Sequence, residues 1–191
     1  KALKAIDNTD FYPSKGKERI KSMIETRPDW CVSRQRVWGV PLPIFISKKT
    51  GDVLVDDEVF ENIAKIYEKE GSDCWFNDDY QIFLGDKYKA EDYEKLSDIV
   101  EVWFDSGSTH SFVLEKRDDL KWPASMYLEG SDQHRGWFHS SLLESCGTRG
   151  VAPFESILSH GFVVDGKGLK MSKSTGNVIA PQDILKKYGA D

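Results

Sequence analysis

The sequence predicts an α/β protein that forms the C-terminal half of a doubly wound parallel sheet, with a small α+β insertion. First, the second half of the chain has the order strand, loop, helix, strand. Second, polar and glycine-rich loops follow the predicted strands, and ligands of such sheets bind at the carboxyl ends of the strands. Third, the segment 46–99 differs in composition and has its own apolar residues. These observations together predict one α/β core and one insertion.

Three apolar runs are expected to form strands of the core, at Val100–Phe104, Ala124–Leu128 and Ile157–Val164. Between the last two strands, His134–Cys146 has apolar residues at helical spacing. A last helix is expected to begin at Pro181, because proline suits the first turn of a helix. The glycine eight residues later is a helix end signal.

The first 45 residues are less regular. Residues 1–25 are polar and charged, with a loop at 13–16 followed by a short helix from 17 to 26. The block 30–45 mixes aromatic and β-branched residues with two prolines, which indicates a strand or extended segment that enters a core.

The insertion begins with a helix signal. Three acidic residues, at positions 56 to 58, suit a helix N-terminus, apolar residues then recur at helical spacing, and Gly71 ends the helix. Trp75-Phe76 and Ile82–Leu84 are interpreted as short strands or turns.

Composition excludes several classes of protein. The 191 residues are 30% charged and 39% hydrophobic, and no apolar run has the length of a membrane span. The three cysteines form no C-x-x-C pair, so we expect neither a disulfide scaffold nor a zinc site, but reduced thiols in a cytoplasmic protein. We also expect a monomer. The aspartates of the acidic segment match no calcium loop, and we predict no metal site.

The net charge of −6 is unevenly distributed. Sixteen Asp and Glu against five Lys give residues 52–101 a charge of −11, which leaves +5 for the remainder of the chain. Anion binding is therefore expected outside the insertion.

The stretch Gly166–Asn177 has the composition of a phosphate-binding loop. It contains three glycines and three lysines in twelve residues, together with hydroxyl side chains. The glycines allow left-handed turns, and the lysines supply mobile positive charge. Such a loop can stabilise the charge that develops as a phosphoryl or nucleotidyl bond breaks. A solvated, lysine-rich surface loop has the same composition, so composition alone does not decide.

The five residues Lys170-Met171-Ser172-Lys173-Ser174 decide in favour of phosphate binding, because they resemble the signature of class I aminoacyl-tRNA synthetases. The segment 127–138, Tyr-Leu-Glu-Gly-Ser-Asp-Gln-His-Arg-Gly-Trp-Phe, is similar to the adenylate-binding segment of the isoleucyl-tRNA synthetases. The segments 101–107 and 27–39 resemble two further blocks of that family, in the same order. The family more often has Asp at the position of Glu101, where the charge is kept.

The resemblance implies a Rossmann-like fold and a set of site residues. Lys173, helped by Lys170, would neutralise the departing pyrophosphate. Adenylate and amino-acid contacts would come from Glu129, Gly130, Asp132, Gln133, Trp103 and Trp137, and ATP contacts from His160, Gly161, Lys170, Met171, Ser172, Lys173 and Ser174. From the residues alone, the two tryptophans could equally belong to a core. Ser131 or Asp132 could simply cap a helix, and Arg34 and Arg36 could bind phosphate or pair with acids.

The resemblance also implies an organisation and a reaction. Its expected parts are the exit segment of an editing insertion (1–25), the return to the core (26–45), the acidic insertion (46–99), the second half of the Rossmann-like core (100–165), and the mobile lysine loop with the following helix (166–191). The reaction would be ATP-dependent activation of isoleucine, with magnesium carried on ATP, and transfer to tRNA(Ile).

The chain is expected to be an inactive fragment of that enzyme. The family's other signature, His-Ile-Gly-His, has no counterpart here, because none of the four histidines is followed by x-Gly-His. The alternatives are a fragment of a valyl or leucyl synthetase, a non-catalytic nucleotide-binding piece, and a nucleotidyltransferase that acts on a small molecule.

Overall fold

The computed structural model describes residues 1–190, which form two compact units. Unit 1 consists of Lys1–Arg27 and the chain from His110 onward, and unit 2 is Pro28–Thr109. The predicted insertion, 46–99, lies inside unit 2, which also includes residues on both sides of it.

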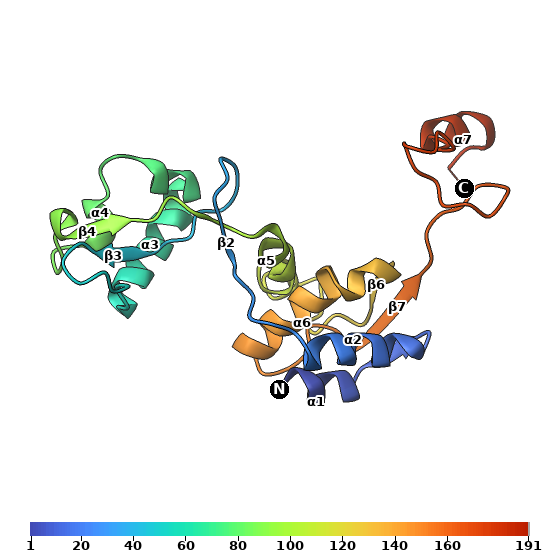
Figure 1. Cartoon of the computed structure of the whole chain (residues 1–191), viewed down its shortest axis with the longest axis horizontal. Helices are drawn as coiled ribbons and strands as arrows, with labels where there is room; N and C mark the ends of the chain where they lie inside the picture. The colour runs from blue at the N-terminus through green and yellow to red at the C-terminus, as the bar shows by residue number, and fades with distance from the viewer. Residues whose placement is uncertain (191) are drawn as a thin grey trace. The chain divides into compact units, whose positions relative to one another are not determined.

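Unit 1 is built on a three-stranded parallel sheet with the order β1-β7-β6. The strands are β1 (Asp10–Tyr12), β6 (Tyr127–Gly130) and β7 (Ser156–His160). Both pairs of neighbours are parallel, and Figure 1 shows β6 and β7 side by side. The prediction of a parallel α/β sheet is confirmed.

Three helices pack against this sheet: α1 (Ala2–Asp7), α2 (Lys15–Glu25) and α6 (Trp137–Thr148). A 3₁₀ turn, η4 (Ser131–His134), connects β6 to α6. Their apolar side chains form one core with those of the strands. Its buried members are Ile6, Phe11, Ile20, Tyr127, Phe138, Leu142, Cys146, Ala152, Phe154 and Ile157. This core fixes the sheet edge at which β6 and β7 end.

Unit 2 contains two antiparallel strand pairs. The pairs are β2 (Ser33–Arg34) with β5 (Ile99–Val100), and β3 (Phe45–Ser47) with β4 (Tyr93–Lys95). Helix α3 (Asp57–Glu70) begins where the acidic residues predict it. The carboxylate of Asp56 accepts the Glu58 N–H at 2.9 Å as N-cap, and Gly71 ends the helix with a φ of 80°.

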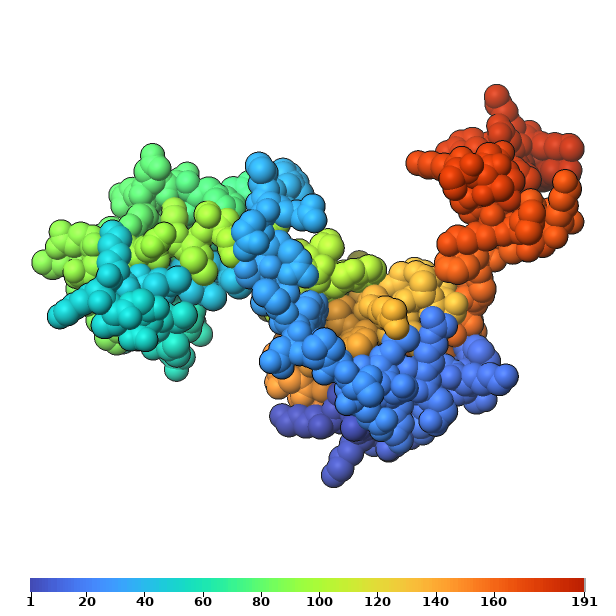
Figure 2. Space-filling view, in the orientation of Figure 1, coloured from blue at the N-terminus to red at the C-terminus, as the bar shows by residue number. Residues whose placement is uncertain are grey.

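Short helical turns complete unit 2, at η1 (Ser72–Phe76), α4 (Gln81–Leu84) and η2 (Ala90–Asp92). The sequence predicts short strands or turns at 75–76 and 82–84. Both segments are helical turns, so the strand alternative is wrong. These residues turn so that Trp75 and Phe83 enter a core at 0% exposure. That core consists of Phe45, Val59, Ile63, Cys74, Trp75, Phe83 and Leu84, and Figure 2 shows the cyan to green residues as one packed body.

The predicted strand Val100–Phe104 is wrong in its second half. Strand β5 ends at Val100, and Val102–Gly107 form a helix, α5. The carboxylate of Glu101 accepts the Trp103 N–H at 3.1 Å and so caps the helix. A π-helical turn, η3 (His110–Leu114), follows.

Residues 1–25 also differ from the prediction, because Asp10–Tyr12 form β1 of the parallel sheet. The predicted third strand ends four residues early, at His160. The last helix, α7 (Pro181–Tyr188), is confirmed, with Pro181 in its first turn and Gly189 at its end. Among residues 1–190, no helix combines the length and apolar character that crossing a bilayer requires.

Candidate functional site at the sheet edge and the lysine loop

The carboxyl ends of β6 and β7 bring together polar residues from two distant segments. In the parallel register, Glu129 pairs with Ser159, and Gly130 pairs with His160. Glu129 and His160 are both exposed at this edge. The register places Glu129 and His160 at the ends of neighbouring parallel strands, and their contact with adenylate stays a prediction.

Gly130 allows the chain to approach its neighbours closely. A Cβ at this position would lie 2.6 Å from Asp132 Oδ1 and 4.0 Å from His160 Cε1. A side chain here would displace the exposed Asp132 carboxylate, so glycine keeps that carboxylate in its observed position. Gly161 has no such restriction, since a Cβ there would meet no atom within 4 Å.

Gln133 organises the start of helix α6. Its Oε1 accepts the Trp137 backbone N–H at 2.9 Å, and its Nε2 donates to Asp132 Oδ2 at 3.1 Å. The sequence suggested Ser131 or Asp132 as a helix cap, but neither side chain caps η4 or α6. The amide of Gln133 satisfies the first turn instead, because it is four residues before Trp137.

Trp137 lies flat against Tyr127, at the beginning of β6. The two ring centroids are 4.0 Å apart and the planes differ by 5°. Tyr127 is 4% exposed, and its hydroxyl is 3.1 Å from Ser141 Oγ. The pKa of Tyr127 is raised by burial, which keeps the hydroxyl protonated. Trp137 is partly buried against the core, and its position in an amino-acid pocket stays a prediction.

Two histidines next to this edge are structural. The Nδ1 of His134 lies 2.8 Å from the Ser131 carbonyl oxygen, and His134 is 1% exposed. Burial lowers the pKa of His134 and that of His139, so both rings are neutral at pH 7. A Cβ at Gly16 would lie 2.9 Å from His134 Nε2, which shows how closely α2 packs here.

The lysine loop is held by Asp165 and Asn177, at its two ends. Asn177 Nδ2 donates to Asp165 Oδ2 at 2.9 Å, and Asn177 Oδ1 accepts the Ser172 N–H at 3.0 Å. Asp165 Oδ1 accepts the backbone N–H groups of Lys167 and Leu169. The hydrogen bond from Asn177 is the main reason that the pKa of Asp165 is lowered. These contacts form a local scaffold around the signature.

The signature residues are presented outward from this scaffold. Lys173 and Ser174 are exposed, while Met171 and Ser172 are half-buried. The Lys170 ammonium lies 3.6 Å from the centre of the Phe162 ring, a cation–π contact.

The prediction of left-handed glycines is right for Gly168 (φ 77°) and Gly176 (φ 69°). It is wrong for Gly166, which is not among the glycines with positive φ.

Trp103 lies in unit 2, on helix α5, and is 42% exposed. Glu101 fixes the start of this helix and is itself 8% exposed. The pKa of Asp105, one turn further on, is raised by burial and by the nearby charge of Glu101. The predicted position of Trp103 in one pocket with Trp137 stays a prediction, because the two tryptophans belong to different units.

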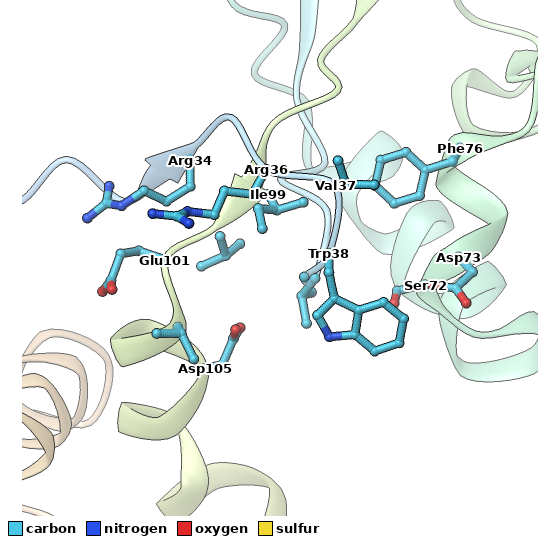
Figure 3. A pocket seen from close by; sticks show the side chains of 14 residues that line it. Arg34, Arg36, Val37, Trp38, Ser72, Asp73, Phe76, Ile99, Glu101 and Asp105 are labelled. Atoms are coloured by element: carbon cyan, nitrogen blue, oxygen red, sulfur yellow. The ribbon is translucent and has the colours of Figure 1, made fainter. Parts of the chain in front are cut away.

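A pocket of about 740 Å³ opens beside α5 within unit 2. Figure 3 shows Arg34 and Arg36 extending to the same side of it, as their alternation in the sequence predicts. Arg34 Nη1 donates to the carbonyl oxygens of Cys31 and Ser33, at 2.6 and 2.8 Å. Its guanidinium is thus held by the backbone, and whether either arginine binds phosphate stays a prediction.

Among residues 1–190, no group of three or more His, Cys, Asp or Glu side chains could hold a metal ion. The three cysteines are free, with Cys31 exposed and the other two buried.

The predicted residues therefore fall into two groups. The sheet edge brings together Glu129, Gly130, His160 and Gly161 with Asp132 and Gln133 of η4, and the loop presents the signature. Trp137 is connected to this edge through Gln133, while its ring lies against Tyr127 at the start of β6. That both groups surround one ATP stays a prediction. Sequence reasoning missed Tyr127 and Asp165, although an aromatic residue at a strand start and an acid at a loop start are recognisable signals.

Comparison with known families decides the membership of the chain. A family model described as tRNA synthetases class I (I, L, M and V) matches residues 1–191. The chain belongs to the class I tRNA synthetases.

Its relatives within this family include isoleucine–tRNA ligases. The chain is 85% identical over 191 residues to the isoleucine–tRNA ligase of Pelagibacter ubique, and 58% identical over 190 residues to that of Zymomonas mobilis. Each match covers the whole chain, but only 21% and 20% of those proteins. The chain thus spans about a fifth of the length of these relatives.

Solved structures agree on the fold. The ternary complex of Agrobacterium radiobacter K84 agnB2 LeuRS with tRNA and LeuAMS matches 85% of this chain and 23% of its own, with a TM-score of 0.57 and 23% identity. Mycobacterium tuberculosis methionyl-tRNA synthetase bound by methionyl-adenylate matches 97% of this chain and 28% of its own, with a TM-score of 0.53 and 18% identity. At these identities the likeness concerns the fold alone.

Proposed function

We propose that this class I synthetase chain is part of an ATP-dependent isoleucine–tRNA ligase. The observation that carries the proposal is the 85% identity, over the whole chain, to a protein of that name. The sheet edge and the lysine loop supply the chemistry that such an enzyme needs. Its substrates would be ATP, isoleucine and tRNA(Ile), with magnesium carried on ATP, in a cytoplasmic, monomeric protein.

The reaction would proceed in two steps. An oxygen of the isoleucine carboxylate attacks the α-phosphorus of ATP, the bond to the bridging oxygen breaks, and pyrophosphate leaves. A ribose hydroxyl at the end of the tRNA then attacks the carbonyl carbon, and AMP leaves. The first step transfers negative charge to pyrophosphate, so a positive group near that leaving group stabilises the transition state.

The loop lysines fit that task. Lys173 is exposed, and Lys170 is near Phe162 at 3.6 Å. Lys170 can exchange the face of the ring for a phosphate oxygen, because a cation–π contact at an exposed site is worth only about 0.5–1 kcal/mol. A lysine suits a moving loop better than an arginine, whose fork favours fixed two-pronged geometry.

The sheet edge fits the amino-acid and adenylate end. The carboxylate of Glu129 is exposed where β6 ends, beside His160 of β7. It can hold an ammonium group or ribose hydroxyls. Trp137 would form an apolar wall suited to a branched aliphatic side chain.

The test is ATP–pyrophosphate exchange with the full-length parent protein, with each aliphatic amino acid in turn. The proposal expects exchange with isoleucine at the highest kcat/KM. A preference for valine or leucine would replace it with the corresponding synthetase, and no exchange with any amino acid would favour a non-catalytic nucleotide-binding protein. The 191-residue chain alone is expected to be inactive, because it lacks the His-Ile-Gly-His signature.

A further inference from the structure

The ring of Tyr127 is stacked in parallel on the indole of Trp137, the proposed wall of the amino-acid pocket. The ring centroids are 4.0 Å apart and nearly parallel, whereas the other aromatic contacts of Tyr127, with Phe138 and Phe154, are tilted at 4.9 Å or more. Parallel stacking of this kind defines the plane of both rings, because rotation of either about its side-chain bonds would bring them into collision.

Tyr127 is itself firmly held. It is 4% exposed at the start of β6, pairs with Ile157 of β7, and has its hydroxyl 3.1 Å from Ser141 Oγ. Ser141 is completely buried on α6, the helix that begins with Trp137. The Tyr127 ring thus connects the sheet to the helix at two points, one through its face and one through its hydroxyl.

The backbone of Trp137 is fixed from another direction. Gln133 Oε1 accepts its N–H at 2.9 Å. With the backbone held by Gln133 and the ring plane held by Tyr127, little freedom remains to the indole. A wall that cannot tilt keeps a pocket at constant width, which is what discrimination by a single methylene requires.

We propose that Tyr127 is a positioning residue for amino-acid specificity, which acts by fixing the plane of the Trp137 indole. This rests on the proposed function. Tyr127 is 4% exposed and stacked on Trp137, so we expect its effect in the discrimination between isoleucine and valine rather than in the chemical step.

The experiment uses the full-length parent and three variants, in ATP–pyrophosphate exchange with isoleucine and with valine. Tyr127→Leu removes the stack and is expected to lower the isoleucine-to-valine ratio of kcat/KM by about threefold to tenfold, mainly through a higher KM for isoleucine. Tyr127→Phe keeps the ring and is expected to keep the ratio within about twofold.

Phe11→Leu is the matched control. Phe11 is 8% exposed in the same core, but it lies on β1, which pairs with β7 and not with β6. Its replacement also removes a buried ring, so it is expected to lower the melting temperature without changing the ratio.

An unchanged isoleucine-to-valine ratio of kcat/KM in Tyr127→Leu would overturn the inference. An equal fall of this ratio in Tyr127→Leu and Phe11→Leu would also overturn it. If Tyr127→Leu does not fold, Tyr127→Met gives the same test, since methionine fills irregular space without a ring face. Absence of isoleucine exchange in the unmodified parent would instead contradict the proposed function.

Discussion

The sheet edge and the lysine loop are built on opposite principles, although both come from unit 1. The sheet edge is supported by Tyr127 at the start of β6 and by His134 in η4, which are almost fully buried, and Gln133 joins η4 to α6. In the loop, Lys173 is exposed, and the scaffold consists of hydrogen bonds within the loop itself.

This difference suits the two tasks of the proposed function. Recognition of a small apolar side chain needs walls at fixed distances, and a packed core supplies them. Stabilisation of a departing pyrophosphate needs charge that follows the reaction, and a loop with its own scaffold can move as a unit. If this holds, the lysine loop moves during the reaction and the sheet edge stays rigid, which can be tested by the following substitutions.

Lys173→Ala in the full-length parent is expected to have the largest effect. Removal of one charge-stabilising group should lower the rate of adenylate formation by about 10²–10³ and weaken ATP binding far less. Rapid-quench measurement of adenylate formation, beside ATP titration, checks this. Lys167→Ala is the matched control, since Lys167 lies in the same loop but outside the signature, and it should do much less. Equal losses from both lysines would indicate a diffuse basic loop.

Gly16→Ala tests the rigidity of the sheet edge. The new methyl group would lie 2.9 Å from His134 Nε2 and 3.3 Å from Phe11 Cδ1, so one of these rings must move. We expect a loss of about 1–3 kcal/mol in the free energy of unfolding, measured by urea denaturation of the parent.

Gly147→Ala, on α6, provides its control. A Cβ there meets nothing within 4 Å, and alanine in a helix should stabilise by about 0.5–1 kcal/mol. An unchanged free energy of unfolding in Gly16→Ala would show that the residues around His134 move more easily than their close packing implies.

Asn177→Ala tests the scaffold of the loop. It removes hydrogen bonds to Asp165, Ser172 and the Lys170 carbonyl. These are exposed or half-buried, so we expect about a tenfold loss in the rate of adenylate formation, with Trp137-dependent discrimination unchanged. A simultaneous loss of isoleucine discrimination would show that the loop and the sheet edge do not act separately.

The smallest effect concerns pH. The pKa of Asp165 is lowered, first by the hydrogen bond from Asn177, so its carboxylate stabilises the folded loop above the ordinary Asp pKa. That contribution is lost as pH falls through the lowered value, below about pH 4. Proteolysis in the loop, with an acid-active protease, should increase in that range for the parent but stay constant in Asp165→Asn.

The sequence predicted the sheet edge better than the elements that support it. The sequence predicts Glu129 and Gly130 at a strand end, because they directly follow an apolar run. The predicted third strand continues to Val164, so the position of His160 at the end of β7 is known only from the structure. The sequence does not predict strand β1. Its three residues become a strand only by pairing with residues of β7 that lie almost 150 positions later. No local pattern reports such a partner.

Capping shows a different limit, because the sequence indicates Asp56 as a cap but not Glu101. Both carboxylates accept the N–H group two residues later, so the spacing is equally local. The difference lies in the surrounding sequence: Asp56 precedes further acidic residues, whereas Glu101 stands inside an apolar run that predicts a strand. The Tyr127–Trp137 stack joins a strand to a helix, so it could be identified only from the packed structure.

The interruption of unit 1 by residues 28–109 has a consequence for biosynthesis. The ribosome releases α1, β1 and α2 first, but the core that buries Ile6, Phe11 and Ile20 also needs β6, β7 and α6. Unit 2 is continuous in sequence, and its own core can close as soon as it has emerged. Within this chain, α1 and α2 therefore wait for these packing partners while the whole of unit 2 is translated, an interval in which a chaperone can bind their apolar faces.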